Sequence, residues 1–155
     1  MIYRILLILL FPFLLTAQQV SLGFDVSNAL YGSEVNKPSL DIQFKVTSIE
    51  SWGEIGIQYE YFNEIKYFSW GMFANKQVNI TDNIKLLAGV EAIQIIRGKV
   101  GFLSYGFNAE TRYWITENIG ISAQYNYRWR EDLRQLYDDG RFVNSGFLNI
   151  IYKWE

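Results

Sequence analysis

The chain has 155 residues, half of them apolar and 17% aromatic, and its formal net charge is -2. This length suits one domain, and a nearly neutral chain argues against a nucleic-acid partner, which would need a surplus of Lys and Arg to bind phosphates. The chain contains no Cys and no His, which excludes disulfide bonds and thiolate or imidazole metal ligands.

The N-terminus has the pattern of a secretory signal peptide. A positive charge at Arg4 precedes the apolar run 5–15, and Ala17 supplies the small residue of a cleavage site. The apolar run is shorter than the roughly 20 residues that a membrane-spanning helix needs. We therefore expect residues 1–17 to be a signal peptide and residues 18–155 to be a single exported domain.

Beyond Gln19 the sequence alternates apolar and polar residues with a period of two, which is typical of strands with two unlike faces. The alternating segments are 20–27, 40–47, 54–61, 68–75, 86–92, 103–113, 119–129 and 148–154. Eight such segments predict an all-β chain that forms an eight-stranded antiparallel up-and-down β-barrel.

Three connections fix the register of this meander. Segments 80–84 and 115–119 are near copies, and each suits a three-residue hairpin loop in which Asn83 or Asn118 takes the left-handed conformation. Gly98–Lys99 suits a two-residue turn with Gly at its first central position. All three turns keep the apolar faces of consecutive strands on the same side of the sheet.

The apolar faces are predicted to contact lipid, because they carry almost no charge at their centres and are aromatic towards their ends. The aromatic residues expected in two interfacial girdles are Tyr59, Tyr61, Phe68, Trp70, Tyr105, Tyr125, Tyr127 and Trp129 at one rim, and Tyr113, Tyr152 and Trp154 at the other. The alternative is a soluble periplasmic barrel of the lipocalin kind, which would bury the apolar face and bind a ligand.

The export signal, the eight segments and the short turns resemble the small outer-membrane barrels of the OmpX and OmpA-transmembrane kind. The junction at Ala17–Gln19 and the turn at 81–83 resemble versions from Bacteroidota. The resemblance implies a transmembrane barrel in the outer membrane of a Gram-negative bacterium. Members of this family usually end on an aromatic residue, whereas here Trp154 is followed by Glu155.

The polar face is expected to fill the barrel interior, where buried charges must pair. In the register set by the turns, Glu91 faces Gly106, which faces Arg128, so the missing side chain of Gly106 lets the two charges meet. The interior polar cluster is predicted to contain Glu60, Glu91, Glu110, Arg112 and Arg128.

No catalytic, cofactor or metal site is predicted. Enzymes on barrels that resemble this one use a catalytic His, which this chain lacks. The acid–base alternative is the carboxylate pair of Glu60 and Glu91, for which we favour a structural role.

Two functions remain, docking to other outer-membrane proteins and a small pore. Large side chains are expected to obstruct the lumen, namely Phe62, Tyr67, Phe73, Phe102, Trp114 and Phe147. Docking would use the lipid-facing belt or the long loops 31–37 and 131–141, which we expect to be neighbours because the first and last strands close the barrel. The loop residues singled out are Tyr31, Glu34, Lys37, Glu131, Asp132, Asp138, Asp139 and Arg141.

Overall fold

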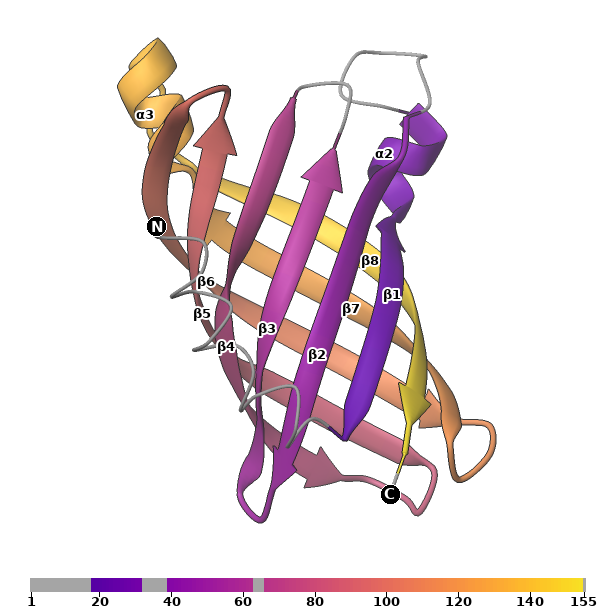
Figure 1. Cartoon of the computed structure of the whole chain (residues 1–155). Helices are drawn as coiled ribbons and strands as arrows, with labels where there is room; N and C mark the ends of the chain where they lie inside the picture. Colours follow the sequence, from indigo (N-terminus) through magenta and orange to yellow (C-terminus); the bar gives the residue numbers. More distant parts are fainter. Residues whose placement is uncertain (1–17, 32–38, 63–65, 155) are drawn as a thin grey trace.

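The structure is a computed structural model that describes residues 18–31, 39–62 and 66–154. Its eight antiparallel strands follow one another around a closed barrel, in which β1 also pairs with β8 (Figure 1). The strands are β1 (Gln19–Asp25), β2 (Asp41–Glu50), β3 (Gly53–Phe62), β4 (Tyr67–Asn79), β5 (Ile84–Arg97), β6 (Val100–Trp114), β7 (Ile119–Trp129) and β8 (Phe142–Lys153). The predicted fold class is confirmed.

Two short helices, α2 (Val26–Tyr31) and α3 (Glu131–Tyr137), lie at one end of the barrel, which we call the helix end. The connections 51–52, 80–83 and 115–118 lie at the opposite end, the turn end, together with the start of β1 and the end of β8 (Figure 1). Among the described residues, no helix is long and apolar enough to cross a membrane. The predicted signal peptide, residues 1–17, lies outside the described residues.

The polar face of each strand points into the barrel and the apolar face points outward. Along β6, side chains from Phe102 to Trp114 are alternately buried and exposed, and the exposed ones include Leu103, which is 77% exposed. The same alternation leaves Ile150 of β8 67% exposed. An apolar outer wall around a polar interior is the arrangement of a transmembrane barrel and the reverse of a soluble one.

The predicted register holds at all three turns. The Ile80 N–H donates to the Ile84 carbonyl at 2.9 Å, and the Ile115 N–H donates to the Ile119 carbonyl at 2.9 Å. Arg97 pairs with Val100 around Gly98, whose φ of 61° is one that glycine adopts readily.

The predicted left-handed conformation of Asn83 and Asn118 is wrong, because neither residue has a positive φ. The hydroxyl of the threonine at the start of each loop closes the turn instead. Thr81 Oγ1 accepts from the Ile84 N–H at 3.0 Å, and Thr116 Oγ1 accepts from the Ile119 N–H at 2.9 Å. The threonines satisfy backbone donors that would otherwise lack a partner.

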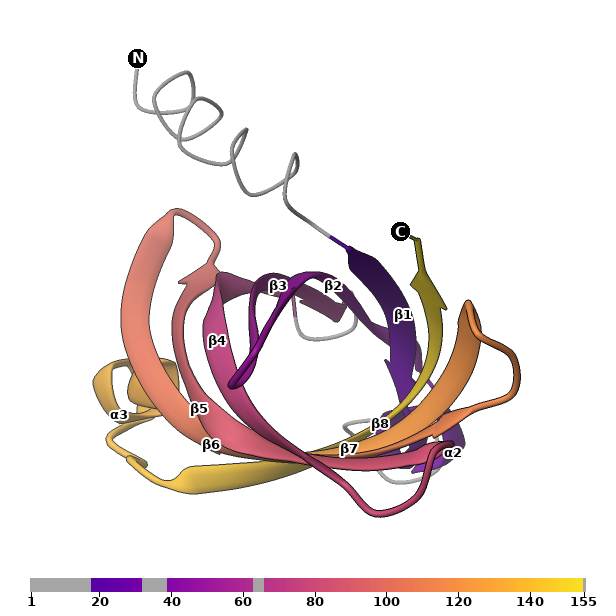
Figure 2. The same ribbon diagram turned by 90° about the horizontal axis from the view of Figure 1, so that it is seen from below.

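The first of the two helix-end loops expected to be neighbours, 31–37, lies outside the described residues except for Tyr31, so only the helices next to the two loops are compared. Although β1 pairs with β8, helix α2 packs against β1 and β8, whereas α3 packs against β6. The pairing of β1 with β8 ends where Asp25 meets Phe147, and the stretch of β8 from Phe142 up to that point pairs with β7 alone. This overhang carries the end of α3 away from β1, and the two helices lie on different sides of the barrel (Figure 2).

Candidate functional site

Arg128 is the centre of a buried ion cluster in the helix-end half of the lumen. Its Nε donates to Glu91 Oε1 at 2.6 Å, and its Nη1 donates to Glu60 Oε2 at 2.6 Å and to the hydroxyl of Tyr67 at 3.0 Å. Gln58 adds a hydrogen bond to the second oxygen of Glu91 at 2.5 Å. These side chains come from β3, β4, β5 and β7, so the cluster joins strands across the whole width of the barrel.

Gly106 lies between Glu91 and Arg128, as predicted from the register. It pairs with Glu91 on β5 and with Arg128 on β7. A Cβ at Gly106 would lie 2.8 Å from Glu91 Oε1 and 2.9 Å from the Tyr127 carbonyl oxygen. Only glycine therefore leaves room for the carboxylate to reach the guanidinium in this geometry.

A second ion cluster fills the turn-end half of the lumen. Arg112 Nη2 donates to Glu110 Oε1 at 2.8 Å, and Arg112 Nη1 donates to Glu54 Oε2 at 3.2 Å. Lys45 Nζ donates to Glu110 Oε2 and to the amide oxygen of Gln124, both at 2.7 Å. The two cations and two carboxylates balance one another, as buried charges must.

Lys45 and Glu54 belong to this cluster although they were not predicted to lie in it. Both lie on the polar face of their segments, which was the available signal. Their partners Glu110 and Arg112 are on β6, however, and reach them across the lumen rather than from a neighbouring strand. Such contacts depend on the tilt of the strands around the barrel, which alternation along one strand does not reveal.

The remaining interior is filled by bulky side chains. The six large residues expected to point inward are all buried, and Phe62, Tyr67 and Phe102 form an apolar cluster with Ile93 and Ile95. The two isoleucines continue the inward face of β5 beyond Glu91 and were not predicted to lie inside. The lumen thus has an apolar layer in addition to its two ion clusters.

Helix α3 is attached to the barrel through Asp132. Asp132 is fully buried (0% exposed) and binds two arginines: Arg97 Nε donates to its Oδ2 at 3.0 Å, and Arg130 Nη2 donates to the same oxygen at 2.6 Å. Both guanidiniums also lie near the ring of Tyr67, at 5.4 Å and 4.9 Å from its centroid. Burial alone would raise the pKa of Asp132, but the hydrogen bonds and charges of Arg130 and Arg97 outweigh it and lower that pKa below its ordinary value.

Helix α2 is attached by a separate set of hydrogen bonds. Asp25 precedes the helix and its Oδ1 accepts from the Asn28 N–H at 2.7 Å, which is the bond of an N-cap. Its other oxygen accepts from the Gly146 N–H at 2.9 Å. The amide of Asn28 donates to Asp41 of β2 at 3.0 Å, so α2 is joined to three strands.

The predicted docking residues differ in their exposure and in the contacts that they already make within the chain. Asp132 is buried, so it anchors α3 and does not face outward. Glu131 binds Arg134, Gln135 and Trp129, and these hydrogen bonds, that of Arg134 first, lower its pKa to about 2. Asp139 binds Arg141 at 3.4 Å at the exposed surface. Tyr31 ends α2, while Glu34 and Lys37 lie outside the described residues.

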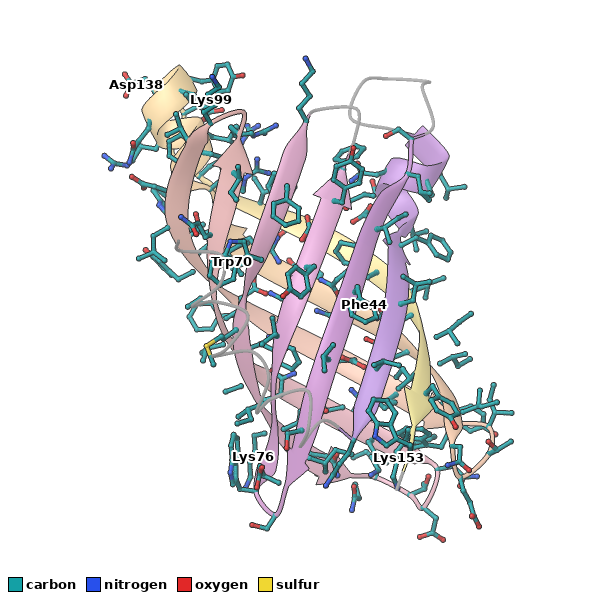
Figure 3. The ribbon with its side chains drawn as sticks, viewed as in Figure 1. Phe44, Trp70, Lys76, Lys99, Asp138 and Lys153 are labelled. Atoms are coloured by element: carbon teal, nitrogen blue, oxygen red, sulfur yellow. The ribbon has the colours of Figure 1, made fainter. Side chains whose placement is uncertain are left out.

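The predicted girdle residues point outward from the wall. On the helix-end side, Phe142 of β8 stacks on Tyr127 with centroids 4.6 Å apart and meets Trp129 edge-on at 5.4 Å. At the turn end, Tyr152 stacks on Trp154 at 6.2 Å. Trp70 and Phe44 lie nearer mid-height, so the first aromatic band reaches from the helix end towards the middle of the barrel (Figure 3).

The described residues contain no group of three or more acidic side chains placed to hold a metal ion. A cavity of about 580 Å³ opens at the helix end, above the Arg128 cluster, and is lined by Glu60, Tyr67 and four arginines. A second cavity, of about 460 Å³, opens at the turn end.

Comparison with solved structures identifies transmembrane β-barrels. A de novo designed transmembrane β-barrel aligns with a TM-score of 0.59 and 9% identity over 88% of this chain and 92% of the design. Neisserial surface protein A (NspA) aligns with a TM-score of 0.56 and 14% identity, over 88% of this chain and 95% of NspA. The outer membrane protein Ail of Yersinia pestis aligns with a TM-score of 0.50 and 13% identity, over 88% and 99% of the two chains.

No family model matches the chain, and no curated protein matches it in sequence. At these low identities the likeness concerns the fold alone. The chain therefore has the closed, eight-stranded, up-and-down fold of a transmembrane β-barrel.

Proposed function

We propose that this protein is a non-enzymatic integral barrel of a Gram-negative outer membrane, with a structural or protein-docking role. The apolar outer wall supports lipid as its surroundings, and the likeness to NspA and Ail supports the outer membrane as its location. Removal of residues 1–17 on export, and a kinship with the OmpX kind or with Bacteroidota barrels, belong to the same proposal.

The single observation that carries the proposal is the closed interior. Two ion clusters, centred on Arg128 and Arg112, cross the lumen at different heights, and an apolar layer around Phe62 fills further space. An eight-stranded barrel is just wide enough for its side chains to fill. A hydrated ion would have to break buried ion pairs to pass.

The same contacts argue against acid–base chemistry at Glu60 and Glu91. Both carboxylates accept hydrogen bonds from Arg128, and both side chains are buried. A general acid must reach a proton acceptor on the substrate, whereas these oxygens are turned to a guanidinium. The cluster is better suited to holding strands together.

Docking is assigned to the exposed part of the connection 131–141. Tyr137 is 69% exposed and Leu136 is also exposed, although α3 itself is attached to the barrel through Asp132. Exposed aromatic and aliphatic side chains on an anchored helix are suited to contact another protein, because little conformational freedom is lost on binding. Other outer-membrane proteins are the partners proposed, with the lipid-facing belt as the other contact surface.

The docking proposal is tested by cross-linking in intact outer membranes. Replacing residues 131–141 with a short turn should leave a folded barrel, recognised by the different gel mobility of heated and unheated samples, while its cross-linked assemblies disappear. The double variant Leu136→Ser, Tyr137→Ser is the milder version. Assemblies that persist in both variants would move the contact to the belt and contradict docking through this loop.

A small pore is the second candidate function. The cavities at the two ends of the lumen favour it, because only the middle of the barrel separates them. A pore would require the Arg128 and Arg112 clusters to rearrange, and its signature would be conductance by the folded protein.

A further inference from the structure

The cavity at the turn end is bounded by three connected segments. The Trp114 N–H donates to the Asn83 carbonyl at 2.9 Å, which joins the end of β6 to the hairpin loop 80–83. The Lys153 N–H donates to the Asn118 carbonyl at 2.8 Å, which joins the end of β8 to the loop 115–118. The space of about 460 Å³ between these segments is therefore built by the fold.

Three hydrogen-bond donors that line this cavity lack partners among the described residues. Lys85 and Lys153 have no carboxylate within 4 Å in the described part of the chain. Trp114 is only 8% exposed, and its indole Nε1 has no acceptor in the described ranges of the chain. The buried indole N–H of Trp114 carries the cost of its lost hydration, and an acceptor in the cavity that it shares with the two half-buried lysines would offset that cost.

The positive and negative side chains around the cavity lie at different depths. On the lumen side, Lys85 of β5 stands opposite Arg112 of β6 in the strand register. The positive charges of Arg112 and Lys153 both act on Lys85. Arg112 is already bound by Glu54 and Glu110. The acidic residues of the cavity, Asp82 and Glu117, lie on the hairpin loops, where both are exposed to solvent. The inner wall is thus positive and the outer rim negative.

We propose that this cavity is a binding site for an oxyanion, the phosphate or carboxylate group of a ligand that approaches from the turn end. The ammonium groups of Lys85 and Lys153 and the indole N–H of Trp114 donate to its oxygens. Charge-assisted hydrogen bonds of this kind are the strong ones, and two lysines offer several donors to one anion. The site is separate from the proposed docking surface, which lies at the opposite end of the barrel.

The test is an NMR titration of the folded full chain, ¹⁵N-labelled, in lipid nanodiscs. The chain has five Trp residues, so its indole N–H region is simple, and Trp114→Phe identifies the relevant signal. Inorganic phosphate and acetate are added in separate series, with chloride keeping the ionic strength constant. We expect the Trp114 signal alone to shift and to saturate. Saturation with phosphate only assigns a phosphate group, saturation with acetate only assigns a carboxylate, and saturation with both assigns a general oxyanion site.

Matched lysine variants separate a built site from surface charge. Lys85→Gln and Lys153→Gln should each weaken binding about tenfold, the effect of losing one charge-assisted hydrogen bond. Lys76→Gln, on the outer wall near the turn end, should bind as the unaltered chain does (Figure 3). A linear, unsaturated shift with both anions, equal shifts of all indole signals, or unchanged affinity in Lys85→Gln and Lys153→Gln would each overturn the proposal.

Discussion

Glu91 and Arg128 lie on strands that are not neighbours, yet their side chains meet at 2.6 Å across Gly106 of the strand between them. The glycine removes the one side chain that would separate them. The Arg128 ion cluster therefore requires a residue without a Cβ at position 106.

Replacing Gly106 with Ala should therefore destabilise the barrel. The new Cβ would meet both Glu91 Oε1 and backbone, so the cost should be about 1–3 kcal/mol, as for overpacking of a core. The measurement is the free energy of unfolding in urea with phospholipid vesicles present. Gly146→Ala is the control, because a Cβ at Gly146 would have no atom of the described residues within 4 Å. Equal stability of the two variants would contradict a close approach at Gly106.

Removing the cation of the same cluster should be more harmful than removing the whole cluster. Arg128→Leu leaves the carboxylates of Glu60 and Glu91 buried without their main partner, at a cost of about 3–5 kcal/mol. Adding Glu60→Gln and Glu91→Gln should recover much of this loss, because no unpaired charge remains. The comparison uses the same urea measurement, and a triple variant less stable than Arg128→Leu would show that the carboxylates have other essential partners.

Charge placed on the outer wall tests which face meets lipid. Ala92 points outward beside Met72, between the heights of Trp70 and Lys76 (Figure 3). Ala92→Arg should cost about 2–4 kcal/mol, and Tyr113→Arg near the turn-end rim should cost about 0–1 kcal/mol. Vesicle-based unfolding gives both values. A similar cost at both depths would be inconsistent with a bilayer around the barrel.

The attachment of α3 through Asp132 should weaken in acid. Arg130 and Arg97 hold the pKa of this carboxyl below its ordinary value of 3.8, so the attachment is fully present above pH 3.8 and is lost as the pH falls through the lower, folded-state pKa. The protection factors of the α3 amides, which are exchange rates corrected for the slower intrinsic exchange in acid, should therefore fall between pH 6 and below about 3. Asp132→Asn should show low protection throughout, and an α3 whose protection factors do not change with pH would contradict the attachment.

The strand order and register followed from the sequence because two local signals agreed. Alternation assigned each side chain to a face, and the turns at 80–84 and 115–119 fixed how successive faces align. Both signals concern strands that follow one another in the sequence. The alignment of Glu91, Gly106 and Arg128 on three consecutive strands could therefore be predicted.

Contacts that cross the lumen, or that depend on the direction of a loop, could not be predicted from the sequence. Lys45 reaches Glu110 over the interior, and Asp132 is buried between two arginines although it lies in an acidic loop. The first contact depends on the tilt of the strands, and the second on where α3 packs against the barrel. The alternation of apolar and polar residues gives no information on either point. Asp132 was therefore expected to be exposed in its loop, whereas it is buried.

Conductance measurements show whether ions can pass through the lumen of the barrel. Folded protein, verified by its heat-dependent gel mobility, is inserted into planar lipid bilayers at neutral pH, with the Arg128→Leu variant measured alongside. We predict no stable current from the unaltered protein, because the Arg128 and Arg112 clusters and the apolar layer fill the lumen. Reproducible single-channel currents from the unaltered protein would contradict a closed barrel and establish the pore as its function.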